Sequence, residues 1–146
     1  MAAHCATLRD DLVRTALSWQ RRFGVAPAII SALSDYDAAR LLGMTEDEYG
    51  ETMSAATAVQ RGYDFAFRGV RVQVKANRPS GKRGSTVTRV PKASNYEWDL
   101  LIWMLYDTGF NVVEAWQWTV AEYRAAFDSR SRLSPADYRR GRRLVP

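Results

Sequence analysis

The sequence contains very little cysteine and histidine. Its 146 residues include one cysteine, Cys5, and one histidine, His4. A single cysteine cannot form a disulfide within the chain, and it cannot build a cysteine-cluster metal site. Because the one histidine lies in a terminal segment expected to fray, the sequence argues against a Ser-His-Asp triad and against multi-histidine metal sites. These scarcities predict a protein of a reducing cytoplasm.

Long hydrophobic runs are also missing. No stretch of about 18 apolar residues occurs, so the sequence predicts no membrane-spanning helix. Residues 1–11 are polar and lack the apolar core of a signal peptide. We therefore expect a cytoplasmic protein without membrane association. Hydrophobic residues make up 47% of the chain, which is enough to form the core of a single domain spanning residues 1–146.

Acidic residues are absent from one part of the chain. Residues 68–92 contain eight Lys or Arg and no Asp or Glu, whereas residues 1–67 contain nine acidic and six basic residues. A second basic segment, residues 129–146, has six arginines and one aspartate. The net charge of +5 is therefore concentrated, which indicates a polyanionic partner. The second segment would either contact that partner or serve as a solubilising tail.

Apolar periodicity predicts helices, then strands, then helices. We expect helices over residues 10–24, 35–43 and 119–127, a short last helix from residue 134 into the arginine cluster, and either helix or loop over 46–58. Ser34 is the expected N-cap of the second helix, and Thr119 forms a capping box with Glu122. Trp19 and the tryptophans near the strands are expected to pack in the core or at a subunit interface.

The middle of the chain has the two-residue period of strands. Polar and apolar residues alternate over 63–68 and 70–75 on either side of Gly69, which predicts a β-hairpin. Residues 77–94 predict a long loop that contains a short strand at 85–90 or none. Residues 98–106 and 110–118 predict two further strands. The fold class expected is α+β (α/β), with a central mixed sheet of about four to five strands flanked by helices.

Three polar residues of the hairpin have a spacing that can carry chemistry. Asp64 begins the first strand, and Gln73 and Lys75 lie two apart on the second, so the last two share a face. A turn near Gly69 brings Asp64 beside Val74 or Lys75. A carboxylate, an amide oxygen and an ammonium at a sheet end suit a metal-and-lysine site. The spacing alone is explained equally well by a structural ion pair between Asp64 and Lys75.

This pattern resembles the active-site motif of the PD-(D/E)xK nuclease superfamily. In that motif an acid is followed, after a spacer, by an acid or Gln, any residue and Lys. Here Asp64 is followed by Gln73-Val74-Lys75, a Q-x-K variant. Family members often place another acid on a preceding helix, which Asp35 matches, with Asp37 as the alternative. The resemblance covers about residues 33–127 and implies a restriction-endonuclease-like fold, with small restriction endonucleases and bacterial relatives as the most similar proteins.

The resemblance implies a metal-dependent DNA endonuclease, prokaryotic or phage-encoded, that hydrolyses phosphodiester bonds as a small type II-like homodimeric restriction enzyme. Mg²⁺ or Mn²⁺ would be held by Asp64, the Val74 carbonyl, Gln73 and Asp35, and Lys75 would stabilise charge on the phosphate. Expected nucleic-acid contacts come from the basic region: Arg71, Asn77, Arg78, Lys82, Arg83, Arg89 and Lys92. Because Gln73 replaces a carboxylate, the alternative is a catalytically inactive nucleic-acid-binding or regulatory module. The tryptophan-rich strands suggest a third possibility, a protein-interaction subunit.

Overall fold

The computed structural model describes residues 7–56 and 62–146, so His4, Cys5 and the end of the 46–58 segment lie outside the described residues. The elements follow in the order α1 (Leu8–Phe23), α2 (Ile30–Leu41), α3 (Glu46–Ala55), β1 (Phe65–Phe67), β2 (Val70–Asn77), β3 (Leu100–Tyr106), β4 (Val112–Thr119), α4 (Val120–Phe127), α5 (Pro135–Tyr138) and β5 (Arg142–Val145). Within these described ranges, no helix is long and apolar enough to cross a membrane.

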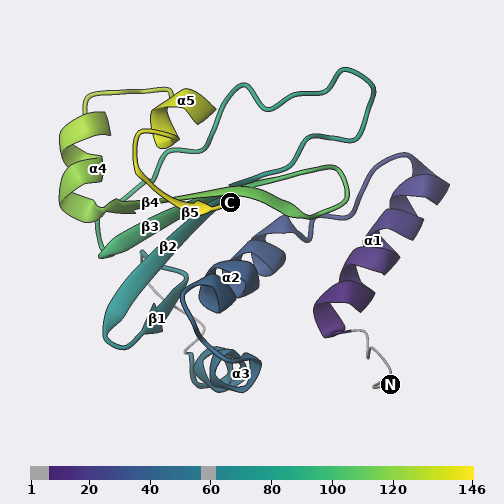
Figure 1. Ribbon diagram of the computed structural model, residues 1–146, viewed down its shortest axis with the longest axis horizontal. Helices are drawn as coiled ribbons and strands as arrows, with labels where there is room; N and C mark the ends of the chain where they lie inside the picture. The colour runs from purple at the N-terminus through teal and green to yellow at the C-terminus, as the bar shows by residue number, and fades with distance from the viewer. Residues whose placement is uncertain (1–6, 57–61) are drawn as a thin grey trace.

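The five strands form one mixed sheet in the order β1-β2-β3-β4-β5 (Figure 1). Strands β2 and β3 are parallel, and every other neighbouring pair is antiparallel. This architecture confirms the expected α+β class and the mixed central sheet. The predicted hairpin is β1–β2, and its turn residues Arg68 and Gly69 both have positive φ angles, 52° and 79°. Such a two-residue turn matches the twist of antiparallel strands and fixes their register.

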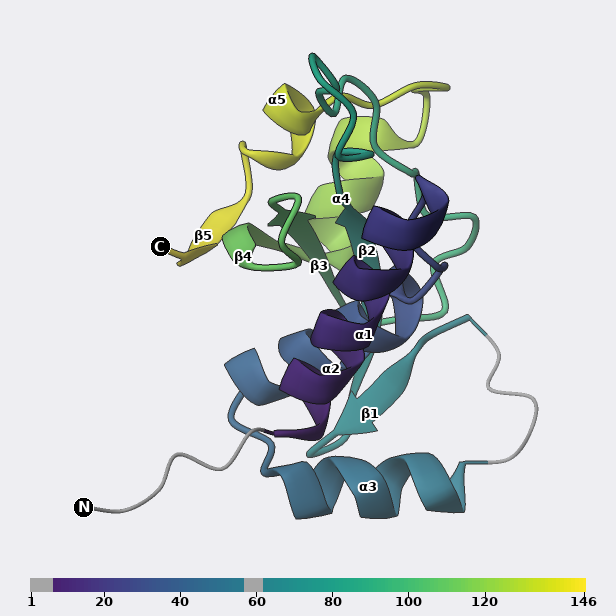
Figure 2. The same cartoon turned by 90° about the vertical axis from the view of Figure 1, so that its right-hand side faces the viewer.

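Helices cover both faces of the sheet (Figures 1 and 2). On one face, α2 packs against the even-numbered apolar residues of β2 and β3, among them Val72, Val74 and Ile102. On the other face, α4 and α5 enclose an aromatic core around Trp103 and Trp118. Strand β3 is buried on both faces, as its continuous apolar run predicts. The strand tryptophans therefore pack within the monomer, whereas Trp19 is 50% exposed, which excludes a core position and leaves the expected interface position open.

One helix boundary differs from the prediction. Helix α2 begins at Ile30, so Ser34 is not an N-cap but lies inside the helix, where its hydroxyl donates to the carbonyl of Ser31. The apolar residues just before Ser34 pack on the core and extend the helix upstream. The capping box at Thr119 is present, with the backbone N–H of Glu122 donating to the threonine hydroxyl.

The C-terminal segment also differs from the prediction. The last helix, α5, forms as predicted and ends before Arg139, but Arg142 and Arg143 belong to β5, which pairs with β4 at the edge of the sheet. The guanidinium of Arg143 lies over the ring of Trp116, 5.3 Å from its centroid, and Arg139 forms an ion pair with Glu114 at 2.8 Å. The C-terminal segment is therefore part of the folded sheet. In the long loop residues 85–90 form no strand, which is the second of the two alternatives, and Val90 forms a single bridge to Leu133.

Candidate functional site

The candidate site lies at the edge of β2, where the short strand β1 leaves it unpaired. Strand β1 pairs with β2 only as far as Val72. Beyond it, the backbone N–H of Asp64 donates to the Val72 carbonyl at 2.8 Å, and the Asp64 carboxylate accepts from the Val74 N–H at 2.7 Å. The N–H and C=O of one strand residue point to the same side. The Val74 carbonyl therefore faces the edge that Asp64 occupies.

A cleft of about 270 Å³ opens at this edge. Helix α2 forms one wall with Asp35, the end of β2 forms the floor, and Pro91 of the long loop lies on the other side. The residues that line it are Ile30, Ser31, Ser34, Asp35, Asp64, Gln73, Val74, Lys75, Ala76 and Pro91. All the residues expected to be catalytic or to bind metal thus surround one cleft, which we call the acidic cleft.

Burial raises the pKa of both carboxylates of the acidic cleft. Burial, together with the nearby charge of Asp64, raises the pKa of Asp35 from 3.8 to about 7. Burial also raises the pKa of Asp64, although the hydrogen bond from Val74 and the charge of Lys75 act in the opposite direction. Asp35 has no hydrogen bond or ion pair with any described residue. The cleft therefore contains more negative charge than its own residues neutralise.

Lys75 approaches Asp64 without closing a direct ion pair. Its charge lowers the pKa of Asp64, yet its ammonium has no hydrogen-bond or ion-pair partner among residues 7–56 and 62–146. A structural Asp64–Lys75 ion pair, the simpler explanation of the spacing, does not form here. The ammonium remains available to a ligand in the cleft.

Asp37, the alternative second acid, lies outside the acidic cleft. Its carboxylate accepts two hydrogen bonds from the guanidinium of Arg9, at 2.6 and 2.8 Å, and a third from the hydroxyl of Tyr106 at 2.6 Å. The Arg9 guanidinium also donates to the carbonyl of Phe110. This network joins α1 to α2 and to β3, so the role of Asp37 is structural.

Tyr49 is a neighbour of the acids that the sequence does not point to. It comes from α3, and its ring meets that of Phe65 edge-on at 6.4 Å. Burial, and then the charges of Asp35 and Asp64, raise its pKa to about 12. The hydroxyl therefore stays protonated at neutral pH. No spacing in the sequence connects Tyr49 with the hairpin.

Four of the seven expected nucleic-acid contacts have side chains already engaged within the chain. Arg71 forms an ion pair with Asp99, and the Arg78 guanidinium donates to Thr108 and Gln20 and covers the ring of Phe110 at 4.0 Å. The side-chain amide of Asn77 donates to the carbonyl of Arg89 and accepts from the indole N–H of Trp103. The Lys92 ammonium donates to the carbonyls of Asp128 and Arg130, just after α4.

The other three cations remain exposed. Lys82, Arg83 and Arg89 have no side-chain partner in the part of the chain that the structure describes. Lys82 lines a second cavity of about 420 Å³, which shares Ile30 and Ala76 with the acidic cleft. The cavity beside Lys82 and the acidic cleft are therefore neighbours.

Comparison with known proteins adds no assignment. No family model matches the chain, and no curated protein matches it significantly. The geometry and charge of the acidic cleft therefore carry the functional argument.

Proposed function

We propose that the acidic cleft is the active site of a metal-dependent nuclease that hydrolyses phosphodiester bonds in DNA. One observation carries the proposal: Asp35 and Asp64, which are far apart in the sequence, line one cleft with Gln73, the Val74 backbone and Lys75. Two carboxylates beside an unpartnered ammonium are a costly arrangement for an edge of a sheet, and such arrangements are typical of functional sites.

The donor set of the cleft suits a hard divalent cation. Asp35 and Asp64 supply carboxylate oxygens, and Val74 and Gln73 supply neutral ones. Mg²⁺ in proteins is commonly held by one or two carboxylates together with waters and substrate phosphates. The described residues contain no cluster of three or more Asp, Glu, His or Cys, so affinity for Mg²⁺ or Mn²⁺ should be modest until a phosphate adds its charge. A bound cation would lower the pKa of a water ligand and polarise the scissile phosphate.

The remaining residues of the cleft position groups and offset charge. The hydrogen bond from the Val74 N–H holds the Asp64 carboxylate at the unpaired edge of β2. Lys75, on the same cleft, would stabilise the negative charge that develops on the phosphate during hydrolysis. The neutral amide of Gln73 adds an oxygen ligand without adding repulsion between carboxylates.

The exposed loop cations support DNA as the substrate. Lys82, Arg83 and Arg89 lie on the acid-free loop, and the cavity beside Lys82 shares Ile30 and Ala76 with the acidic cleft. Contacts between such side chains and phosphates supply affinity that falls with salt and does not depend on sequence. A DNA backbone bound by the loop would thus lead to the cleft.

A cleavage assay tests the proposal. A mixture of plasmid and genomic DNAs should be cut in Mg²⁺ and not in EDTA, because a narrow recognition site could be missing from any one DNA. Lys75→Ala should lower the cleavage rate by about 100-fold or more. Lys92→Ala removes an equal charge whose ammonium is bound to α4, and it should leave cleavage within a few-fold of the unmodified protein.

Two results would contradict the proposal. Cleavage that is equal in EDTA or unaffected by Lys75→Ala would place the chemistry elsewhere or in a contaminant. Salt-sensitive DNA binding with no cleavage of any DNA would instead support the inactive nucleic-acid-binding module that Gln73 suggests.

A further inference from the structure

Helix α1 has an apolar stripe that the rest of the described chain does not cover. Its inner face, with Ala16 at its centre, packs on the core. On a neighbouring face, four large apolar side chains are 76%, 40%, 50% and 58% exposed: Leu8, Leu12, Trp19 and Phe23. Their spacing aligns them along the whole helix. We call these four residues the outer stripe.

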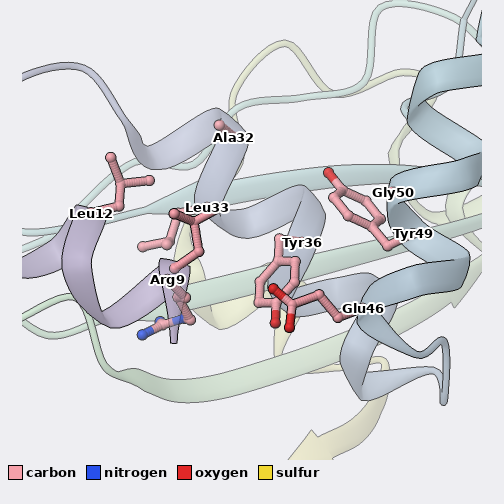
Figure 3. A pocket seen from close by; sticks show the side chains of 9 residues that line it. Arg9, Leu12, Ala32, Leu33, Tyr36, Glu46, Tyr49 and Gly50 are labelled. Atoms are coloured by element: carbon pink, nitrogen blue, oxygen red, sulfur yellow. The ribbon is translucent and has the colours of Figure 1, made fainter. Parts of the chain in front are cut away.

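An apolar groove adjoins the N-terminal half of the outer stripe. Leu8 and Leu12 border it on α1, Ala32, Leu33 and Tyr36 lie on α2, and Tyr49 and Glu46 on α3 (Figure 3). Its volume is about 250 Å³, larger than the cavity of roughly 150 Å³ that accepts a benzene ring. Figure 3 shows both tyrosine rings standing between α2 and α3 beside this space. The groove therefore has room for an aromatic side chain.

The C-terminal half of the outer stripe carries two aromatic side chains. The rings of Trp19 and Phe23 lie 4.7 Å apart, tilted by 55°, and both project from the helix. Aromatic side chains that fill an apolar pocket are the commonest anchors of protein interfaces. One half of the stripe thus borders a groove, and the other half carries the kind of side chain that such a groove accepts.

We infer that the outer stripe joins two copies of this chain through antiparallel packing of their α1 helices. Leu8 and Leu12 precede the midpoint of the helix by the same intervals at which Phe23 and Trp19 follow it. A two-fold axis at that midpoint places Phe23 of the second copy opposite Leu8, and Trp19 of the second copy opposite Leu12. Each aromatic pair then lies over the groove of the other copy, so the interface is self-complementary.

The charges beside the stripe favour the antiparallel direction. Asp11 and Arg22 are about three helical turns apart and lie on the same flank of the stripe. In an antiparallel pair equal flanks meet, so Asp11 of each copy lies near Arg22 of the other. In a parallel pair equal flanks lie on opposite sides of the interface, so these two residues would not meet. Within one chain, Asp11 has only an exposed ion pair with Arg14, which is weak and easily exchanged.

The pairing leaves the acidic cleft open, and the inference does not depend on the proposed nuclease activity. The cleft uses Ile30, Ser34 and Asp35, on the side of α2 opposite to Leu33 and Tyr36 of the groove. A helix of 16 residues is about 24 Å long. The area it can bury is small beside the roughly 800 Å² per partner of a stable interface, so we expect a dissociation constant in the micromolar range.

Sedimentation velocity at concentrations from about 1 to about 500 µM, a range that includes the expected dissociation constant, tests the inference. The test exchanges the charges of Asp11 and Arg22. The 16.5 kDa chain should convert from monomer to dimer over this range. Asp11→Arg alone and Arg22→Asp alone should each weaken dimerisation about tenfold, because each creates like-charge contacts at both ends of the interface. An equal mixture of the two variants should restore it, because every contact between them is again of opposite sign.

A second pair of variants tests the aromatic anchor. Trp19→Glu should weaken dimerisation about 30-fold or more. Val113→Glu introduces the same charge at another exposed apolar residue and should have no effect. A monomer throughout the range would overturn the inference and leave the stripe to a different partner. A dimer that persists in Trp19→Glu, or a variant mixture no tighter than either variant alone, would also overturn it.

Discussion

The carboxylates on the two sides of α2 have opposite surroundings. On one side, Asp37 receives three hydrogen bonds from Arg9 and Tyr106 and ties α1 and β3 to the helix. On the other side, Asp35 lines the acidic cleft and has no partner among the described residues, and burial and the charge of Asp64 raise its pKa. One helix turn therefore presents both a structural acid and an acid whose charged form the fold does not stabilise.

The basic side chains divide in the same way. Arg78 and Lys92 have their donors bonded to carbonyls of the fold, whereas Lys82 and Arg83 have no side-chain partner in the described part of the chain. The acidic cleft and the cavity that Lys82 lines are neighbours that share Ile30 and Ala76. Stability explains the first class, and it leaves the second class unexplained unless a ligand supplies the missing charge. The following predictions test this division.

The largest effect on stability should come from Asp37. Asp37→Ala leaves the Arg9 guanidinium, which is 21% exposed, without its partner and removes a hydrogen bond from buried Tyr106. We expect a loss of about 2–4 kcal/mol in the free energy of unfolding. Asp99→Ala, which breaks the exposed ion pair with Arg71, should cost less than about 1 kcal/mol. Urea unfolding measures both, and equal losses would contradict a structural role for Asp37.

Removing the charge of Asp35 should raise the free energy of unfolding, whereas removing Asp37 should lower it. Its pKa, about 7 in the folded chain, lies above the ordinary value of 3.8, so the folded chain holds this proton more tightly than the unfolded chain does. This contribution to stability therefore falls as pH rises from about 4 to 7 and stays low above that range. Asparagine does not ionise, so Asp35→Asn avoids the stability that is lost when Asp35 becomes charged. It should raise the free energy of unfolding at pH 8 by about 1–3 kcal/mol.

Urea unfolding in EDTA at both pH values measures the Asp35→Asn effect. Near pH 4, where Asp35 is largely protonated in the folded chain, the variant and the unmodified protein should be nearly equal. A variant that is less stable at pH 8 would show that Asp35 is a structural acid like Asp37, and the division between the two sides of α2 would fail.

The smallest effects should come from single loop cations. Lys82→Ala should lower the dependence of DNA affinity on salt, the slope of log K against log salt concentration, by about one unit. Lys92→Ala should leave the slope unchanged, because that ammonium is bonded to carbonyls of α4. Binding isotherms at several salt concentrations give both slopes. Identical slopes for the two variants would contradict a contact between the loop and DNA.

Local patterns were sufficient to predict most of the fold. The hairpin and strand β3 follow from alternation, turn residues and an apolar run, and the helix after Thr119 follows from its capping box. Strand β5 was missed because it depends on pairing with β4 and not on its own arginine-rich sequence. The start of α2 was misplaced because Ser34, a good N-cap residue, is held inside the helix by core packing of the residues before it.

The candidate site was only partly accessible from sequence. Hairpin geometry predicts that Asp64 approaches Val74, because a two-residue turn fixes the register. The position of Asp35 depends on how α2 packs on the sheet, and a resemblance to a family motif supplied it. The proximity of Tyr49 to the acids and the capture of Lys92 by α4 are contacts between distant segments, and no local pattern contains them.

The most direct test of the central claim is to look for the cation itself. Crystals of the metal-free protein soaked in Mn²⁺ should show anomalous density between the Asp64 carboxylate and the Val74 carbonyl. The same soak of Asp64→Asn crystals should lose this density while the fold stays intact, since the asparagine oxygen can still accept from the Val74 N–H. Density in the acidic cleft of the unmodified protein alone is the predicted result. An empty cleft at saturating Mn²⁺, or equal density in both proteins, would contradict the account.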